Sequence, residues 1–234
     1  MFRDAWAQEL WGARREVRVV SEAASVELEL DRAQAIADEL YAALAEVSPL
    51  VGWKLGATDP RTQARFGTDR PFTAPIYGDG IIANGDAISL SRFVAPRLEA
   101  EIGLRVHVDG IQLVPCVEIV DCRFPGWKLT LPGAIADFGL QGAFIFGQGM
   151  AGDPAEVSEI EVTVKRDGIE MQRGSANPAD AVARLRYLSQ ELHQDGHSSH
   201  LVATGSLISP ISLDPGHWVA DFGEFGSLSL RVVH

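Results

Sequence analysis

A strict alternation of apolar and polar residues between Leu98 and Val106 constrains the fold more than any other feature of the sequence. One parity carries the apolar residues Leu98, Ala100, Ile102, Leu104 and Val106. Glu99 and Glu101 fall on the other parity. A period of two is that of a half-buried β-strand, in which residues two apart project from one face with Cα atoms roughly 7 Å apart. We therefore predict a strand that directs two carboxylates toward one point.

Two neighbouring carboxylates repel each other, so a shared proton or a divalent cation must compensate them. Glu118 adds a third carboxylate, in a β-branched run where its parity is opposite to that of Val117 and Ile119. Three carboxylates without a matching set of thiolates or imidazoles favour a hard cation, Mg²⁺ or Mn²⁺. The solvated face of an edge strand also presents such a Glu-x-Glu pair, and the residues alone leave both interpretations open.

The motifs around these carboxylates resemble those of the fumarylacetoacetate hydrolase superfamily. They are Gly-Trp-Lys-Leu-Gly at 52–56, Glu99-x-Glu101, and Glu-Ile-Val-Asp-x-Arg at 118–123. The sequence is most similar to the branch of 2-keto-4-pentenoate hydratases, 2-oxo-hept-4-ene-1,7-dioate hydratases and 4-oxalocrotonate decarboxylases, from about Leu30 to the C-terminus. The resemblance implies that Glu99, Glu101 and Glu118 are the metal ligands.

The same resemblance implies further site residues. Lys54 would lie in the active site, where its ammonium stabilises negative charge or exchanges a proton, although most lysines are solvated surface amines. Asp79, in a Gly-Asp-Gly stretch, is a candidate second acid–base group, and the stretch is equally typical of a turn. A family turn at 204–206 would hold a substrate carboxylate through backbone N–H groups and a hydroxyl. The candidate substrate-binding residues are Gln141, Thr204, Gly205 and Ser206.

Three departures from the family pattern lie nearby. Gly133 stands where the family has Asp, and Phe138 where it has Asn, which predicts a less polar pocket with a different substrate or weaker chemistry. Only sixteen residues separate Glu101 from Glu118, where the family inserts a helix. Gly110 predicts a tight hairpin there, which would keep the two strands side by side.

The composition excludes several function classes. The chain has 20 Lys and Arg against 32 Asp and Glu, a net charge of −12, so it would repel nucleic acid. No apolar run approaches the roughly 18 residues of a membrane span, and the N-terminus lacks a signal-peptide core, so we expect a cytoplasmic protein. Cys116 and Cys122 would lie roughly 20 Å apart on one strand, and we expect both to be reduced.

Periodicity places the other elements. Trp6, Leu10 and Trp11 have helical spacing, and a second apolar stripe predicts a helix that begins at a capping box of Asp31 and Gln34 and ends before Pro49. A short strand follows at 51–56, and the stretch 57–79 predicts a long loop.

The C-terminal half has its own signals. Asp167-Gly168 predicts a hairpin, and Asn177 predicts the cap of a helix over 178–195. We interpret His193, His197 and His200 as a polar loop, because Gly196 would interrupt the helix that a zinc site needs.

We predict one α+β protein, mainly β, with a curved mixed β-roll of the fumarylacetoacetate hydrolase type over 51–234 and a helical region over 1–50 packed on it. The resemblance implies a homo-oligomeric, Mg²⁺- or Mn²⁺-dependent hydratase that adds water to a small 2-hydroxy-2,4-dienoate to give a 4-hydroxy-2-oxo acid. The alternatives are a 2-oxo diacid decarboxylase, an acylpyruvate C–C hydrolase and, because of Gly133, Phe138 and the missing helix between the ligands, a degenerate non-catalytic partner subunit.

Overall fold

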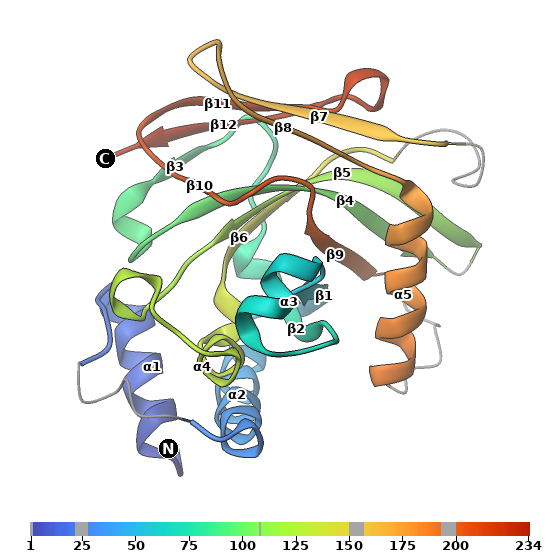
Figure 1. The fold of residues 1–234 in the computed structure, drawn as a ribbon. Helices are drawn as coiled ribbons and strands as arrows, with labels where there is room; N and C mark the ends of the chain where they lie inside the picture. The colour runs from blue at the N-terminus through green and yellow to red at the C-terminus, as the bar shows by residue number, and fades with distance from the viewer. Residues whose placement is uncertain (1, 22–27, 108, 150–156, 193–199) are drawn as a thin grey trace.

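The computed structural model describes all residues except 1, 22–27, 108, 150–156 and 193–199. Two curved β-sheets lie one above the other, with most of the helices gathered below the larger sheet and one helix along its side (Figure 1). This arrangement confirms the predicted α+β, mainly β roll. No helix in the described part of the chain is long and apolar enough to cross a bilayer.

The larger sheet has seven strands and carries the predicted carboxylates. Its order is β2-β1-β9-β4-β5-β6, with β10 paired to β4. The β1–β9 pair is parallel and the other pairs are antiparallel, so the sheet is mixed. Its strands are β1 (Leu50–Gly56), β2 (Phe72–Tyr77), β4 (Arg97–His107), β5 (Gly110–Val120), β6 (Gln141–Phe146), β9 (His200–Ser206) and β10 (Ile211–Ser212).

A five-stranded sheet packs against one face of the larger sheet, in the order β3-β12-β11-β7-β8. Its strands are β3 (Ala87–Ser89), β7 (Ile160–Arg166), β8 (Ile169–Ala176), β11 (Gly216–Asp221) and β12 (Ser227–Val233). Apolar residues of both sheets, including Ile102 and Trp218, form one buried cluster between them. The alternate residues of β4, Glu99 and Glu101 among them, therefore face the other side of the larger sheet.

The helices are α1 (Ala5–Glu16), α2 (Leu30–Ala45), α3 (Pro60–Phe66), α4 (Leu131–Ala136) and α5 (Pro178–Leu192). Side chains of α1, α2 and α4 form a second core cluster, which includes Leu40 and Phe138. Short 3₁₀ turns connect strands at η2 (Gly78–Gly80), η3 (Leu90–Arg92), η4 (Pro125–Trp127), η5 (Phe138–Leu140) and η7 (Gly223–Phe225). The helical layer thus closes the face of the larger sheet that bears the carboxylates.

Several local predictions are confirmed. The chain reverses at Asp167 and Gly168 between β7 and β8, and β4 and β5 pair from their ends at His107 and Gly110. The Asn177 side chain accepts a hydrogen bond from the Ala179 N–H at the start of α5. Residues 193–195 of the predicted helix lie outside the described residues, as do His193 and His197 of the histidine cluster. Both cysteines are free and buried.

Two local predictions are wrong. The capping box does not form, because the N-cap of α2 is Glu29 and the Gln34 amide donates to Asp38 one turn later. The stretch 57–79 is not a long loop, since it contains α3 and β2. Its helix is short and its strand contains Pro75, so neither produced a clear period in the sequence.

Candidate active site

Three carboxylates converge on the helical side of the larger sheet. Glu99 on β4 is the register partner of Glu118 on β5, and Glu101 lies two residues further along β4 on the same face. One carboxylate oxygen from each residue lies within 4.8 Å of the others. Glu101 and Glu118 are buried and Glu99 is half-buried. This is the cluster that the strand parity predicted.

Burial and mutual repulsion oppose the ionisation of this cluster. Burial, followed by the charge of Glu118, raises the pKa of Glu99 to about 8. The same two causes raise the pKa of Glu101 well above its ordinary value. Burial also raises the pKa of Glu118, against the opposing effect of Lys54. The unliganded site therefore holds protons near neutral pH, and a bound cation would release them.

The unused oxygen of Glu101 fits a divalent cation. The Gly205 N–H donates to Glu101 Oε2 at 2.9 Å, whereas the buried Oε1 has no hydrogen-bond partner among the described residues. A buried carboxylate oxygen without a partner is costly, and coordination would satisfy it. The three side chains offer only carboxylate oxygens, which suit Mg²⁺ or Mn²⁺. These residues can therefore hold the predicted metal.

Lys54 projects from β1 into the same cluster. Its Nζ donates to Glu118 Oε1 at 2.8 Å and to the Gly139 carbonyl at 2.8 Å, and the residue is only 3% exposed. Burial opposes its charge, but the neighbouring carboxylates, Glu118 first and then Glu99, outweigh that effect and raise its pKa. Lys54 is therefore a buried ammonium at neutral pH, with one carboxylate and one carbonyl as partners.

The turn that supplies the Gly139 carbonyl has an unusual backbone. Phe138, Gly139 and Leu140 all have positive φ, of 53°, 60° and 63°. A Cβ on Gly139 would lie 2.6 Å from the Ala74 Cβ, so only glycine fits the approach to β2. Consecutive left-handed residues are strained, and such strain occurs where surrounding structure enforces a functional geometry.

A cavity of about 550 Å³ opens beside the cluster. Lys54 and Glu99 lie in its wall, together with α3 and the segment that follows Gly205. Its other polar side chains are Thr58, Asp59, Arg61, Thr62, Arg65, Arg97, Ser206 and Ser209. Ala57, Trp127 and Leu140, which also line it, have positive φ. The volume suits a small molecule.

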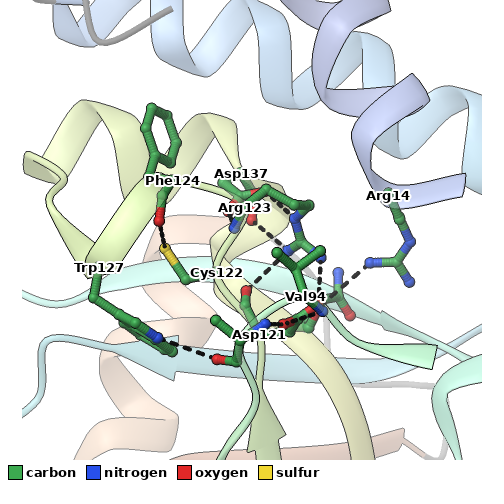
Figure 2. A network of polar contacts seen from close by, with 10 residues as sticks. Arg14, Val94, Asp121, Cys122, Arg123, Phe124, Trp127 and Asp137 are labelled. Atoms are coloured by element: carbon green, nitrogen blue, oxygen red, sulfur yellow. Dashed lines mark hydrogen bonds and ion pairs between the residues drawn. The ribbon is translucent and has the colours of Figure 1, made fainter. Parts of the chain in front are cut away.

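A buried ion network surrounds Arg123 (Figure 2). The Arg123 guanidinium pairs with Asp137 through Nε and with Asp121 Oδ2 at 3.2 Å through an Nη, and the three residues are at most 3% exposed. The Arg123 N–H also donates to Asp137 Oδ2 at 2.9 Å. Asp137 directly precedes the turn that holds Lys54, so the network fixes where that turn begins.

The other end of the network reaches Trp127. Asp121 accepts hydrogen bonds from the N–H groups of Val94 and Ala95, and the Ala95 carbonyl accepts one from the Trp127 indole at 3.1 Å (Figure 2). Trp127 lines the cavity. The network therefore connects Asp137, which precedes the turn that holds Lys54, with Trp127 in the cavity wall, partly through backbone groups.

The predicted substrate-binding residues divide into two groups. Gly205 and Ser206 line the cavity. The Thr204 hydroxyl donates to the Ile102 carbonyl at 2.6 Å, within the sheet. Gln141 is buried at the start of β6, where its carbonyl accepts a hydrogen bond from Arg14, and it is not among the cavity-lining residues.

Asp79 and the two family departures lie away from the cavity. Asp79 is exposed on the η2 turn, with its N–H bonded to the Ser48 hydroxyl, and it does not contribute to the described cavity wall. Gly133 is buried in α4. Phe138 is also buried, with the guanidinium carbons of Arg14 and Arg123 at 4.7 and 5.4 Å from its ring centre. The loss of polar groups at these two positions therefore does not change the described cavity wall.

The wall contains polar and aromatic residues that the sequence motifs did not indicate, among them Asp59, Arg97 and Trp127. A signal existed for Arg97, because it has the parity of Glu99 and lies two residues before it on the same strand face. Asp59 could be predicted only as the cap of α3, and the position of Trp127 depends on a tertiary contact.

Comparison with curated proteins identifies relatives along most of the chain. It is 31% identical over 197 residues to 2-keto-4-pentenoate hydratase 1 of Dechloromonas aromatica (strain RCB), a match that covers 74% of this chain and 73% of the relative. The chain belongs to the 2-keto-4-pentenoate hydratase family. A 4-oxalocrotonate decarboxylase of Pseudomonas putida is 24% identical over 205 residues, covering 79% and 78% of the two chains. No protein-family model matches the sequence.

Solved structures show that this hydratase-family chain has the fumarylacetoacetate hydrolase fold. The 4-oxalocrotonate decarboxylase of Pseudomonas putida G7, complexed with magnesium and adipate, has a TM-score of 0.87 at 21% identity and covers 98% of this chain and 96% of its own. Fumarylpyruvate hydrolase of Pseudomonas aeruginosa, in complex with Mn²⁺ and pyruvate, has a TM-score of 0.55 at 15% identity, with coverage of 80% and 91%.

Proposed function

We propose that this chain is a divalent-metal-dependent hydratase that converts a 2-hydroxy-2,4-dienoate into a 4-hydroxy-2-oxo acid. The observation that carries the proposal is the cluster of Glu99, Glu101 and Glu118, with the Lys54 ammonium 2.8 Å from Glu118. The choice of reaction is supported by membership of the hydratase family, at 31% identity over most of the chain. Glu99, Glu101 and Glu118 would hold the metal.

A Mg²⁺ or Mn²⁺ ion bound there would supply Lewis acidity toward the oxygens of a 2-oxo carboxylate. Lys54 supplies a second positive charge and a proton source. Since it is almost fully buried and its pKa is raised, it stays protonated and acts without competition from bulk water. Its bonds to Glu118 and to the Gly139 carbonyl fix the direction of its remaining N–H.

The reaction needs two proton movements. Ketonisation transfers one proton from the 2-hydroxyl oxygen to C5 of the dienol and gives a 2-oxo-3-enoate. Water then adds, with its hydroxyl at C4 and a proton at C3. Lys54 can deliver and recover a proton at this site, whereas Asp79 is too exposed and too peripheral for us to include it. The Ser206 hydroxyl and the Gly205 backbone lie in the cavity wall, and we propose that they contact the substrate.

Decarboxylation of a 2-oxo diacid is the second candidate. The similarity at TM-score 0.87 to a 4-oxalocrotonate decarboxylase favours it, and the buried Lys54 ammonium would stabilise the negative charge that loss of CO₂ leaves on the substrate. Gly133, Phe138 and the missing helix between the ligands motivate the non-catalytic alternative. Neither residue lines the cavity, and Glu99 and Glu118 pair directly across β4 and β5 without that helix.

The test is an assay of the purified, Mn²⁺-loaded chain against 2-hydroxypenta-2,4-dienoate and its dicarboxylate relatives. Loss of the dienoate absorbance without CO₂ release is the expected result and supports hydration. Stoichiometric CO₂ release from a 2-oxo diacid, without hydration of any dienoate, would replace the proposal with the decarboxylase. Turnover of none of these compounds would refute both. The cytoplasmic location and the homo-oligomer remain predictions of the sequence.

A further inference from the structure

Arg97 presents an unpaired guanidinium to the cavity. It lies on β4 two residues before Glu99, on the same strand face, and it is partly exposed in the cavity wall. Among the described residues, no carboxylate lies within ion-pair distance of the Arg97 guanidinium. No group of the described residues accepts a hydrogen bond from it either. A guanidinium carries five N–H donors. All five are therefore available to a ligand.

Trp127 holds this guanidinium in place. The Arg97 Cζ lies 4.1 Å from the centre of the Trp127 ring, a stacking contact that fixes the guanidinium plane and leaves its N–H edge free. Trp127 itself is well held, since its indole donates to the Ala95 carbonyl and its own carbonyl accepts from Arg65. The cation is thus oriented before any ligand arrives.

The backbone at Trp127 is strained to make this contact. Gly126 and Trp127 have consecutive positive φ values of 62° and 60°. A bulky residue in the left-handed region costs free energy, and it persists where the surrounding structure enforces it, typically at ligand sites. This backbone conformation positions the Trp127 ring against Arg97, in the cavity wall that also contains Glu99.

The charge of this wall favours an anion. Glu99 is a proposed metal ligand and Lys54 is paired with Glu118. The remaining charged side chains of the wall are three arginines, Arg61, Arg65 and Arg97, and one carboxylate, Asp59. Asp59 already accepts two backbone hydrogen bonds at the start of α3, from Arg61 and Thr62. The wall therefore carries more positive than negative side chains besides Lys54 and Glu99.

We propose that Arg97 binds the second carboxylate of a dicarboxylic substrate, so that the reacting compound is a 2-hydroxydienedioate and not a monocarboxylic dienoate. The proposal rests on the proposed function, in which the first carboxylate and the 2-oxo group lie at the glutamate cluster. Positions two apart on a strand are separated by roughly 7 Å, which is comparable with an extended six-carbon diacid. A carboxylate also matches the guanidinium fork in a bidentate pair.

A matched ligand pair tests this assignment. 2-Oxoadipate and 2-oxohexanoate share the 1-carboxylate and the 2-oxo group and differ only in the terminal carboxylate or methyl group. Calorimetry with the Mn²⁺-loaded protein should show 2-oxoadipate binding about tenfold or more tightly, as expected for a charged hydrogen-bonded pair. Arg97→Met should remove this preference and leave the affinity for 2-oxohexanoate unchanged, whereas Arg97→Lys should retain part of it.

Arg92→Met is the control, because Arg92 is exposed on η3 and outside the cavity wall, and this variant should keep the full preference. Equal affinity of the wild-type protein for both acids would overturn the role of Arg97 and leave the proposed function standing. A preference for the diacid that survives in Arg97→Met would also overturn it. Binding of neither acid in the presence of Mn²⁺ would refute this proposal and the proposed function together.

Discussion

Glu99 and Glu118 are direct register partners across the β4–β5 ladder, so their carboxylates leave the same face of the larger sheet. Like charges directly opposite each other destabilise an antiparallel pair, and Glu118 is also removed from water. Lys54 offsets only part of that repulsion, through Glu118. The sheet therefore has an arrangement that is favourable only with a further cation or with bound protons, and the predictions below depend on that property.

Replacing Lys54 tests its role as proton donor and charge partner. Lys54→Met should lower kcat/KM by about 10²- to 10⁴-fold, because a positioned general acid contributes roughly that factor. Metal affinity should persist, since Lys54 is not a ligand. Lys165→Met is the matched control, because Lys165 lies on β7 in the other sheet. A Lys54 variant with unchanged turnover on the dienoate would remove the lysine from the mechanism.

The buried network and an exposed ion pair should respond very differently to the loss of a charge. Asp137→Asn leaves Arg123 buried beside a neutral amide, and we expect a loss of about 3 to 5 kcal/mol in the free energy of unfolding. Asp214→Asn removes the ion pair with Arg166. The Arg166 side chain is 31% exposed and the Asp214 side chain 61%, so this change should lower the free energy of unfolding by less than about 1 kcal/mol. Urea denaturation measures both, and equal losses would contradict the structural importance of the network.

Substitution of two glycines with positive φ, Gly205 and Gly223, distinguishes the cost of backbone strain from the cost of a steric clash. Gly205 has φ of 100°, and a Cβ there would overlap the Thr58 side chain, whereas Gly223 has φ of 65° and open space around it. Both Gly→Ala changes incur a backbone penalty of about 1 kcal/mol, and only Gly205→Ala adds the clash. It should also weaken Mn²⁺ binding, because the Gly205 N–H orients Glu101. Thermal melting and metal titration of the two variants test this, and equal behaviour would refute it.

The stability of the metal-free protein should fall as pH rises. The pKa of Glu99 is about 8 in the folded protein against 4.5 ordinarily, so the folded state holds an extra proton between these values. The folded state has the full benefit of this proton below about pH 4.5 and loses it as the pH rises through 8. Between these values the free energy of unfolding should fall by up to about 1.4 kcal/mol per pH unit for each extra proton. Urea denaturation in EDTA from pH 5 to 8 measures the slope, and Glu99→Gln should reduce it.

Local patterns predicted the elements that carry the metal site. The parity of 98–106 fixed the common face of Glu99 and Glu101, because side-chain alternation along a strand is a local property. The hairpin at Gly110 is likewise a local signal, and it brings Glu118 opposite Glu99. The motif resemblance indicated Lys54. Periodicity could not predict that Lys54, on β1, reaches Glu118 on β5.

The residues that the sequence could not place depend on tertiary contacts. Arg123 follows β5 and Asp137 follows α4, so only the tertiary structure makes them a buried pair, since a charged residue in a sequence gives no sign of its burial. Asp79 shows the opposite case, because its Gly-Asp-Gly context suits a catalytic loop and an exposed turn equally. Arg97 had the parity of the ligands, but its contact with Trp127 joins residues thirty positions apart.

Mn²⁺ binding measured by calorimetry tests the central claim most directly, because it asks whether the three carboxylates form one metal site. We predict that the wild-type chain binds one Mn²⁺ ion and that Glu99→Gln and Glu101→Gln each weaken binding by at least about 10²-fold, since each removes one anionic ligand. Glu161→Gln, at an exposed position of β7, should bind as the wild type does. Undiminished Mn²⁺ binding in the double variant Glu99→Gln, Glu101→Gln would contradict the account.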